Sequence, residues 1–102
     1  MMSHFRVATF DVTSGTLDEL VEVIKQPGSF SDIFPALPGF KSWSLLEVSP
    51  TQVMSISVWE THEEAEEAIA ASSEWVAVNM ADTVKRTFNT SAAEILVINA
   101  ND

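Results

Sequence analysis

A strand pattern that leads straight into a capped helix constrains this fold more than any other feature. Residues 52–60 alternate in character, and Thr61 and Glu64 follow at the spacing of a capping box. In that motif the Thr61 side chain accepts from the backbone N–H of Glu64, and the Glu64 side chain reaches back. Small alanines then recur on one helical face, which favours close packing of a helix over 62–71 on a sheet.

The remaining segments complete the order strand, helix, strand, strand, helix, strand. Thr16 and Glu19 fit a second capping box. The order predicts one α+β domain over 1–102 with the ferredoxin-like β-α-β-β-α-β plan, in which helices cover one face of an antiparallel sheet. The predicted elements are strands over 4–12, 40–48, 52–60 and 88–100 (strongest over 94–98), a helix over about 16–26, a short helix or turn over 29–34 stopped by Pro35, and helices over about 62–71 and 73–86 separated by a break at Ser72-Ser73.

Apolar residues occur on both faces of the predicted strands. In the third strand we expect Met54, Ile56 and Val58 to face the helices, with Val53 and Trp59 on the opposite face. A single layer of helices covers only one face of a sheet, so the other face needs a partner. The sequence therefore predicts a homodimer whose sheets pack face to face.

Composition excludes several classes of function. The net charge is -10, with only five basic residues, so nucleic acid is not an expected partner. The chain has no cysteine, no apolar run of membrane-spanning length, and no signal-peptide layout at its N-terminus. We expect a cytoplasmic protein with no membrane association. Glycine-rich phosphate loops and metal-ligand spacings are also missing from the sequence, so no cofactor and no metal are expected.

Three short segments resemble the antibiotic-biosynthesis-monooxygenase-like family of the dimeric α/β barrel superfamily. They are Pro38-Gly39-Phe40, Val58-Trp59-Glu60-Thr61 and Ala71-Ser72-Ser73-Glu74-Trp75. The resemblance implies two ferredoxin-like subunits joined through their sheets, each with a pocket between sheet and helices. It also implies an activity found in some members, the oxidation of anthrone or quinol-type aromatics to quinones by molecular oxygen without a bound metal or flavin.

Other members of the family degrade haem, and this sequence departs from their pattern. The resemblance would require an asparagine on the first strand, a tryptophan on the helix after the third strand, and a histidine ligand on the next helix. The first strand has no asparagine, Ala68 lies near the tryptophan position, and Val78 or Asn79 lies near the histidine position. Haem degradation is therefore disfavoured.

Trp75, Asn79 and Arg86 are the first candidates for chemistry, because they recur near one stripe of the predicted helix over 73–86. Trp75 would stack on a flat substrate, Asn79 would donate to an oxyanion, and Arg86 would offset its charge. Each has a structural alternative. Trp75 would anchor the core, Asn79 would bond to backbone or water, and Arg86 would pair with Asp82 on the surface.

Further candidates come from the aromatic residues and a histidine. Phe34 and Phe40 would bind substrate in a pocket wall, although their spacing also suits a core. Trp59 would bind substrate or close the barrel or dimer interface, which Trp43 would also cover. His62 would serve as a base or be exposed on the first helical turn.

Three hypotheses of function follow. The first is a cofactor-independent monooxygenase acting on a small flat aromatic or quinol-like compound. The alternative is a non-catalytic dimer that binds a small apolar molecule or another protein. A cavity with Asn79 or Arg86 pointing inward would favour chemistry. An isomerase or lyase is a third possibility, for which His62 with Glu60 is the one local acid–base pair.

Overall fold

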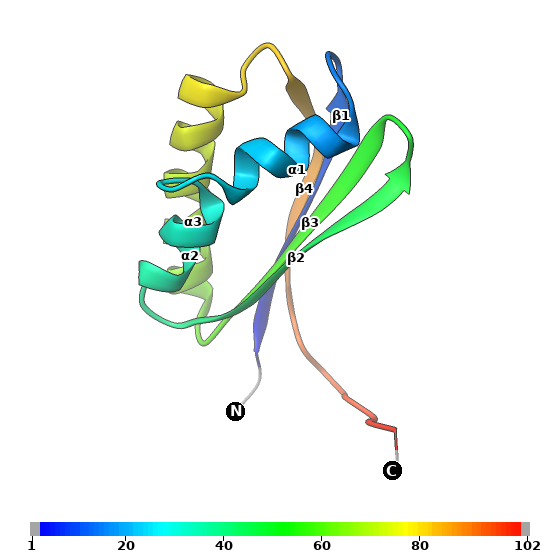
Figure 1. The fold of residues 1–102 in the computed structure, drawn as a ribbon. Coiled ribbons are helices and arrows are strands. Elements are labelled where there is room, and N and C mark those ends of the chain that lie inside the picture. Colours follow the sequence, from blue (N-terminus) through cyan, green and yellow to red (C-terminus); the bar gives the residue numbers. More distant parts are fainter. Residues whose placement is uncertain (1–2, 101–102) are drawn as a thin grey trace.

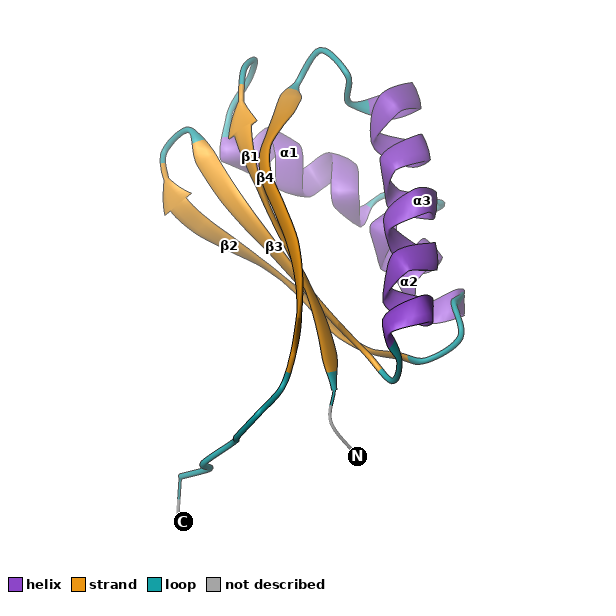
Figure 2. Cartoon of the chain, turned by 180° about the vertical axis from the view of Figure 1, so that it is seen from behind, coloured by secondary structure: helices purple, strands orange, loops and turns teal. Residues whose placement is uncertain are grey.

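The computed structural model describes residues 3–100 as a four-stranded antiparallel sheet with helices packed on one face (Figures 1 and 2). The strand order in the sheet is β2-β3-β1-β4. The ferredoxin-like α+β prediction is confirmed, and the sheet of this single chain is open. The elements are β1 (His4–Val12), α1 (Leu17–Lys25), α2 (Phe30–Ala36), β2 (Phe40–Ser49), β3 (Gln52–Trp59), α3 (His62–Asn79) and β4 (Val84–Ala93).

The two helix starts with a predicted capping box, at Thr16 and Thr61, are both capped. At α1, Thr16 accepts from the backbone N–H of Glu19, and the Glu19 carboxylate accepts from the backbone N–H of Thr16, so that capping box is complete. At α3, the Thr61 hydroxyl accepts from the backbone N–H of Glu64 at 3.2 Å. The Glu64 carboxylate accepts from the Thr61 hydroxyl at 3.0 Å, so here the return bond reaches the side chain instead of the backbone.

The predicted break at Ser72-Ser73 was wrong, because α3 runs through both serines and ends at Asn79. Serine hydroxyls can disturb a helix by competing for its backbone groups. Here the Ser72 hydroxyl donates to the carbonyl of Ile69 in the same helix at 3.1 Å, which leaves the helix intact. None of the helices in the described residues is long and apolar enough to cross a membrane.

Pro35 does not stop α2, which continues to Ala36. Proline lacks the N–H that an interior helical residue donates. The final turn closes without that bond, because the N–H of Leu37 donates to the carbonyl of Phe34 at 3.1 Å.

The last strand lies earlier in the chain than predicted. β4 begins at Val84 and ends at Ala93, which pairs with His4 at the start of β1. Just beyond that point the N–H of Glu94 donates to the carbonyl of Ser3 at 2.8 Å, and residues 95–98 then continue past the start of β1 without a strand partner within the described chain. Their apolar side chains are exposed, with Ile95 at 92 % and Ile98 at 85 %.

The predicted faces of β3 were reversed. Val53 and Trp59 are buried under the helices, at 4 % and 0 % exposure, whereas Ile56 points to the other side of the sheet, opposite Val7 of β1. Hydrophobicity could not separate two faces that both carry apolar residues. We call the uncovered side the open face. It contains Phe5, Val7, Leu46, Met54, Ile56, Val58 and Phe88.

Candidate functional site

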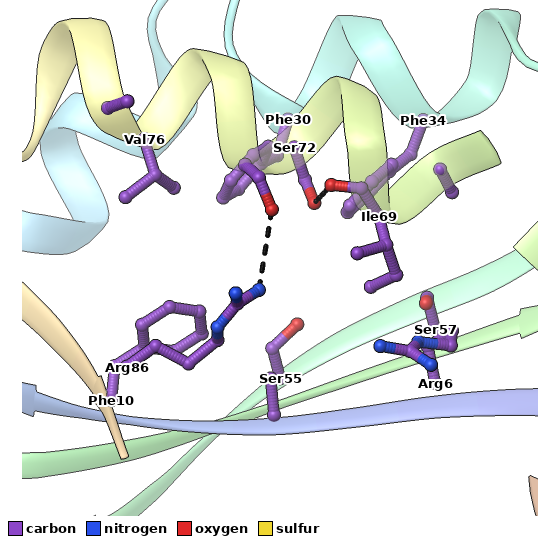
Figure 3. A pocket seen from close by; sticks show the side chains of 14 residues that line it. Arg6, Phe10, Phe30, Phe34, Ser55, Ser57, Ile69, Ser72, Val76 and Arg86 are labelled. Carbon is purple, nitrogen blue, oxygen red and sulfur yellow. Dashed lines mark hydrogen bonds between the residues drawn. The ribbon is translucent and has the colours of Figure 1, made fainter. Parts of the chain in front are cut away.

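A cavity of about 210 Å³ lies between the covered face of the sheet and helices α2 and α3 (Figure 3). It is partly open to solvent, and its lining is mostly apolar. An apolar cavity of about 150 Å³ is enough to admit benzene, so this one has room for a ligand at least as large as a single ring. The sheet contributes Arg6, Ala8, Phe10, Ser55, Ser57 and Arg86 to the lining.

The cavity exists because small residues oppose one another across the two layers. Ala8 and Ser55 lie on the sheet side, and Ala68 and Ala77 lie on α3. Side chains of this size cannot fill the space between a sheet and a helix that larger residues hold apart. The volume of the cavity therefore follows from the small side chains at these four positions.

Two serine–tryptophan pairs form the sheet side of the cavity. The indole Nε1 of Trp43 donates to the Ser55 hydroxyl, and that of Trp59 donates to the Ser57 hydroxyl, both at 2.8 Å. A hydroxyl that accepts in this way still has its own hydrogen to donate. Within residues 3–100 neither hydroxyl donates to a protein acceptor, so both remain available to a ligand.

Arg6 is on β1 and lies beside Ser57 of β3. The Arg6 side chain is only 8 % exposed. Its Nη1 donates to Oε1 of Glu66 at 3.2 Å, and its Nη2 donates to Oδ1 of Asn89. Its Nε is buried and has no partner among the described residues. A buried donor without a partner is rare in native structures and calls for an explanation.

Arg86 lines the other end of the cavity, beside Phe10 (Figure 3). It was predicted on a helix, but α3 ends at Asn79 and Arg86 is carried by β4. Its Nη1 donates to the Ser73 hydroxyl on α3 at 3.3 Å, and it makes no ion pair with Asp82 within the described chain. The strand, not the helix, therefore directs Arg86 toward the cavity.

Aromatic rings of α2 form one wall of the cavity. Phe30 and Phe34 stack with ring centroids 5.1 Å apart and planes 7° from parallel. Trp43 packs edge-on against both rings, at 5.7 Å and 5.6 Å. These contacts fix the two rings in place, so the wall is rigid and suited to a flat apolar ligand.

Phe34 and Arg86 are the two predicted site residues that line the cavity. Trp75 lies behind the wall, with its ring centroid 4.7 Å from that of Phe30. Asn79 is exposed at the end of α3, where its amide donates to the carbonyl of Trp75 at 3.0 Å. His62 is exposed at the start of α3, 3.6 Å from the carboxylate of Glu66.

Trp59 and Phe40 belong to the core instead of the cavity lining. The two rings meet edge to face at 5.4 Å, and Trp59 also meets Phe34 at 5.8 Å. The prediction that Trp59 and Trp43 cover a dimer interface was wrong, because both face the helices. Their indoles act on the site indirectly, through the hydroxyls of Ser55 and Ser57.

Sequence reasoning missed Arg6 and the two serines. The signal was present as an arginine that alternates with Ala8 and Phe10 on a strand.

Both arginines of the chain line this cavity, and the three lysines do not. The lining includes no Asp, Glu or His within residues 3–100, and no group of three or more metal-ligating side chains gathers in that part of the chain.

Fold and site together define a ferredoxin-like α+β protein with an aromatic-walled cavity that carries two guanidinium groups. No family model and no curated protein matches the sequence. Solved structures do match over nearly the whole chain. SnoaB, a cofactor-independent oxygenase from Streptomyces nogalater, is 18% identical, with 100% of both chains covered and a TM-score of 0.68.

Two further structures are proposed antibiotic biosynthesis monooxygenases. The protein from Chloroflexus aurantiacus is 13% identical over 95% of this chain and 97% of its own, with a TM-score of 0.66. The protein from Bacillus cereus is 21% identical over 98% of this chain and 96% of its own, with a TM-score of 0.56. The chain thus has the fold of antibiotic biosynthesis monooxygenase structures, as the resemblance implied.

Proposed function

We propose that this protein is a cofactor-independent monooxygenase that acts on a small flat aromatic or quinol-like compound. The observation that carries the proposal is that Arg86 shares one cavity with the stacked rings of Phe30 and Phe34. A flat ring would lie along the aromatic wall, with the guanidinium of Arg86 near its edge. The fold shared with SnoaB supports the same reaction class.

The reaction needs an acidic C–H on an electron-rich ring. The substrate loses that proton to water, and its carbanion transfers an electron to dioxygen. The radical pair then recombines to a peroxide anion, which is protonated to a hydroperoxide by the hydronium ion formed in the first step. Loss of water from the hydroperoxide leaves a carbonyl, so one oxygen atom enters the product and the other leaves as water. Overall, a ring CH₂ and O₂ yield a ring C=O and H₂O.

Arg86 would stabilise the negative charge that develops on the ring oxygen during deprotonation. Fixed donors aimed at developing charge are usually the largest electrostatic contribution to a rate. The hydroxyl of Ser55 would add a second donor from the sheet. Phe30, Phe34 and Ile69 would shield the inner part of the cavity from bulk water, which strengthens the interaction with Ser55.

Oxygen consumption tests the function directly. The purified chain would be supplied with a panel of anthrones and quinols in air-saturated buffer, with an electrode recording uptake against the uncatalysed rate. Incorporation of one ¹⁸O atom from ¹⁸O₂ into the ring carbonyl would identify the monooxygenase reaction. Uptake no faster than the uncatalysed rate across the panel would contradict the proposal.

The non-catalytic alternative is favoured by one observation, the lack of a carboxylate or imidazole among the cavity residues of the described chain. A binding protein needs no proton acceptor, whereas an oxygenase without one depends on the acidity of its substrate. Tight binding of a quinol with no oxygen uptake would support this alternative.

We also propose that two copies of the chain pair through the open face. Leu46 and Phe88 on that face are 45 % and 53 % exposed, and exposed apolar side chains that gather on one face of a sheet are typical of an interface. The segment over 95–98, which has no strand partner within the described chain, extends from the same sheet, as Figure 2 shows. An extended apolar segment with free backbone groups is suited to pairing with another chain, and a second copy would satisfy both features.

A further inference from the structure

Arg6 is a buried cation whose hydrogen bonds are incomplete. A guanidinium carries five N–H groups, and within the described chain Arg6 uses one at Glu66 and one at Asn89. The buried Nε makes no bond there. Buried arginine normally satisfies its donors, so the bonds to Glu66 and Asn89 leave this guanidinium incompletely partnered within the described residues.

The charge of Arg6 is also only partly balanced. Its one carboxylate neighbour within residues 3–100, Glu66, is 45 % exposed and lies 3.6 Å from His62 as well. Glu66 is not part of the cavity lining, whereas Arg6 and Arg86 both are. The cavity therefore carries two positive groups inside a chain whose net charge is -10, and it is a local site for anions on a protein that otherwise repels them.

The Ser57 hydroxyl completes a donor pair at the Arg6 end. Ser57 is 5 % exposed, and its oxygen is occupied by the indole N–H of Trp59. Its hydrogen is therefore directed to whatever acceptor lies beside it. Figure 3 shows Ser57 and Arg6 side by side on the sheet, away from Arg86. Arg6 and Phe10, the β-pair partner of Arg86, are about 13 Å apart along the strand.

We propose that Arg6 and Ser57 form a subsite for a carboxylate, so that the ligand of this cavity is a planar aromatic acid. A carboxylate is small and flat, accepts charge-assisted hydrogen bonds from arginine, and can extend from a ring that lies against Phe34. The inference takes the flat aromatic ligand from the proposed function and adds the anionic group. Arg6 binds the fixed charge, and Arg86 remains free to act at the opposite edge of the ring.

Calorimetric titration with a matched pair of ligands tests the subsite without requiring turnover. The probes are 1-naphthoate and 1-naphthamide, which share shape and ring but differ in charge. The wild-type chain should bind the naphthoate at least about tenfold more tightly. Arg6→Gln should abolish that preference. Lys85→Gln, which removes one positive charge outside the cavity lining, should retain it.

Equal affinity for the two probes, no binding of naphthoate, or a preference that survives in Arg6→Gln would each overturn the proposal. If Arg6→Gln fails to fold, ¹⁵N NMR of the wild-type chain decides. The sequence has two arginines, so two Nε signals are expected, and Arg86→Gln assigns them. Naphthoate should shift the Arg6 signal and naphthamide should not; an identical response to both ligands overturns the subsite.

Failure of the subsite and failure of the proposed function give different results. Oxygen uptake that is equally fast on an anthrone acid and its amide would retain the oxygenase and discard the Arg6 subsite. A clear preference for naphthoate without oxygen uptake on any substrate would retain the subsite and favour the binding-protein alternative.

Discussion

The indole nitrogen of Trp59 donates a 2.8 Å hydrogen bond to the hydroxyl of Ser57, two residues earlier on the same strand. Side chains at this spacing lie on one face of a strand. The pair therefore joins the most buried aromatic ring of the core to the sheet side of the cavity. It also explains how a serine is tolerated under the helices, because its oxygen has a partner.

A double-mutant cycle on this pair should reveal coupling. Trp59→Phe removes the donor and leaves the Ser57 oxygen buried without it, and Ser57→Ala removes the acceptor. We expect the two changes together to destabilise the chain less than the sum of the single changes, by about 1 kcal/mol. Urea unfolding of the four proteins measures this, and additive effects would show that the bond contributes nothing specific.

Ile56→Glu should disrupt dimer formation. Ile56 lies on the open face opposite Val7, where a carboxylate would be buried between two sheets without a partner. Sedimentation velocity should show the wild type as a dimer and this variant as a monomer. Ala70→Glu adds the same charge at an exposed position of α3 and should remain dimeric. A wild type that stays monomeric at every concentration would contradict the interface.

Arg86→Gln should lower the rate of oxygen consumption by about 10²-fold, the effect of removing one donor to a developing oxyanion. The thermal midpoint should change little, because the Arg86 side chain is exposed and makes one 3.3 Å bond to Ser73. Lys85→Gln is the matched control and should keep the wild-type rate. A variant at residue 86 with undiminished activity would exclude Arg86 from the reaction.

Thr61→Ala should reduce the free energy of unfolding by about 1 kcal/mol, because it removes the side chain that caps α3. Thr61→Ser keeps the hydroxyl and should be close to wild type. Chemical denaturation of the three proteins measures the difference. If the alanine variant unfolds at the wild-type midpoint, water replaces the cap at no cost.

Local patterns in the sequence predicted the order of strands and helices, apart from dividing α3 in two, and placed the starts of α1, α2 and α3 to within a residue. Thr16 and Thr61 each act through neighbours a few positions away, so their roles do not depend on the rest of the fold. The Ser72-Ser73 break failed because hydroxyl bonds to Ile69 and from Arg86 satisfy these serines inside the helix. The Arg86 partner is set by tertiary structure, whereas the Ile69 carbonyl lies within α3 itself.

To predict the candidate site, one must know which face of the sheet the helices cover, and the hydrophobicity of β3 does not distinguish its two faces. The more apolar set of β3, which includes Ile56, lies on the open face, whereas Ser55 and Ser57 lie under the helices. Arg6 lies on the same covered face, opposite Ser57, and was missed for the same reason. The segment over 94–98 has the sequence of a strand, but β1 begins at His4, and after the bond from the N–H of Glu94 to the carbonyl of Ser3 no described residue pairs with it.

The serine–tryptophan pairs also determine how the protein will report its own ligands. The chain contains three tryptophans and no tyrosine, so its ultraviolet emission comes from indole alone. Trp43 and Trp59 are hydrogen-bonded to the two hydroxyls that face the cavity. A ligand that accepts a hydrogen bond from either hydroxyl polarises the indole bonded to that hydroxyl. Ligand binding should therefore shift the wavelength of tryptophan emission, which can be recorded without a label.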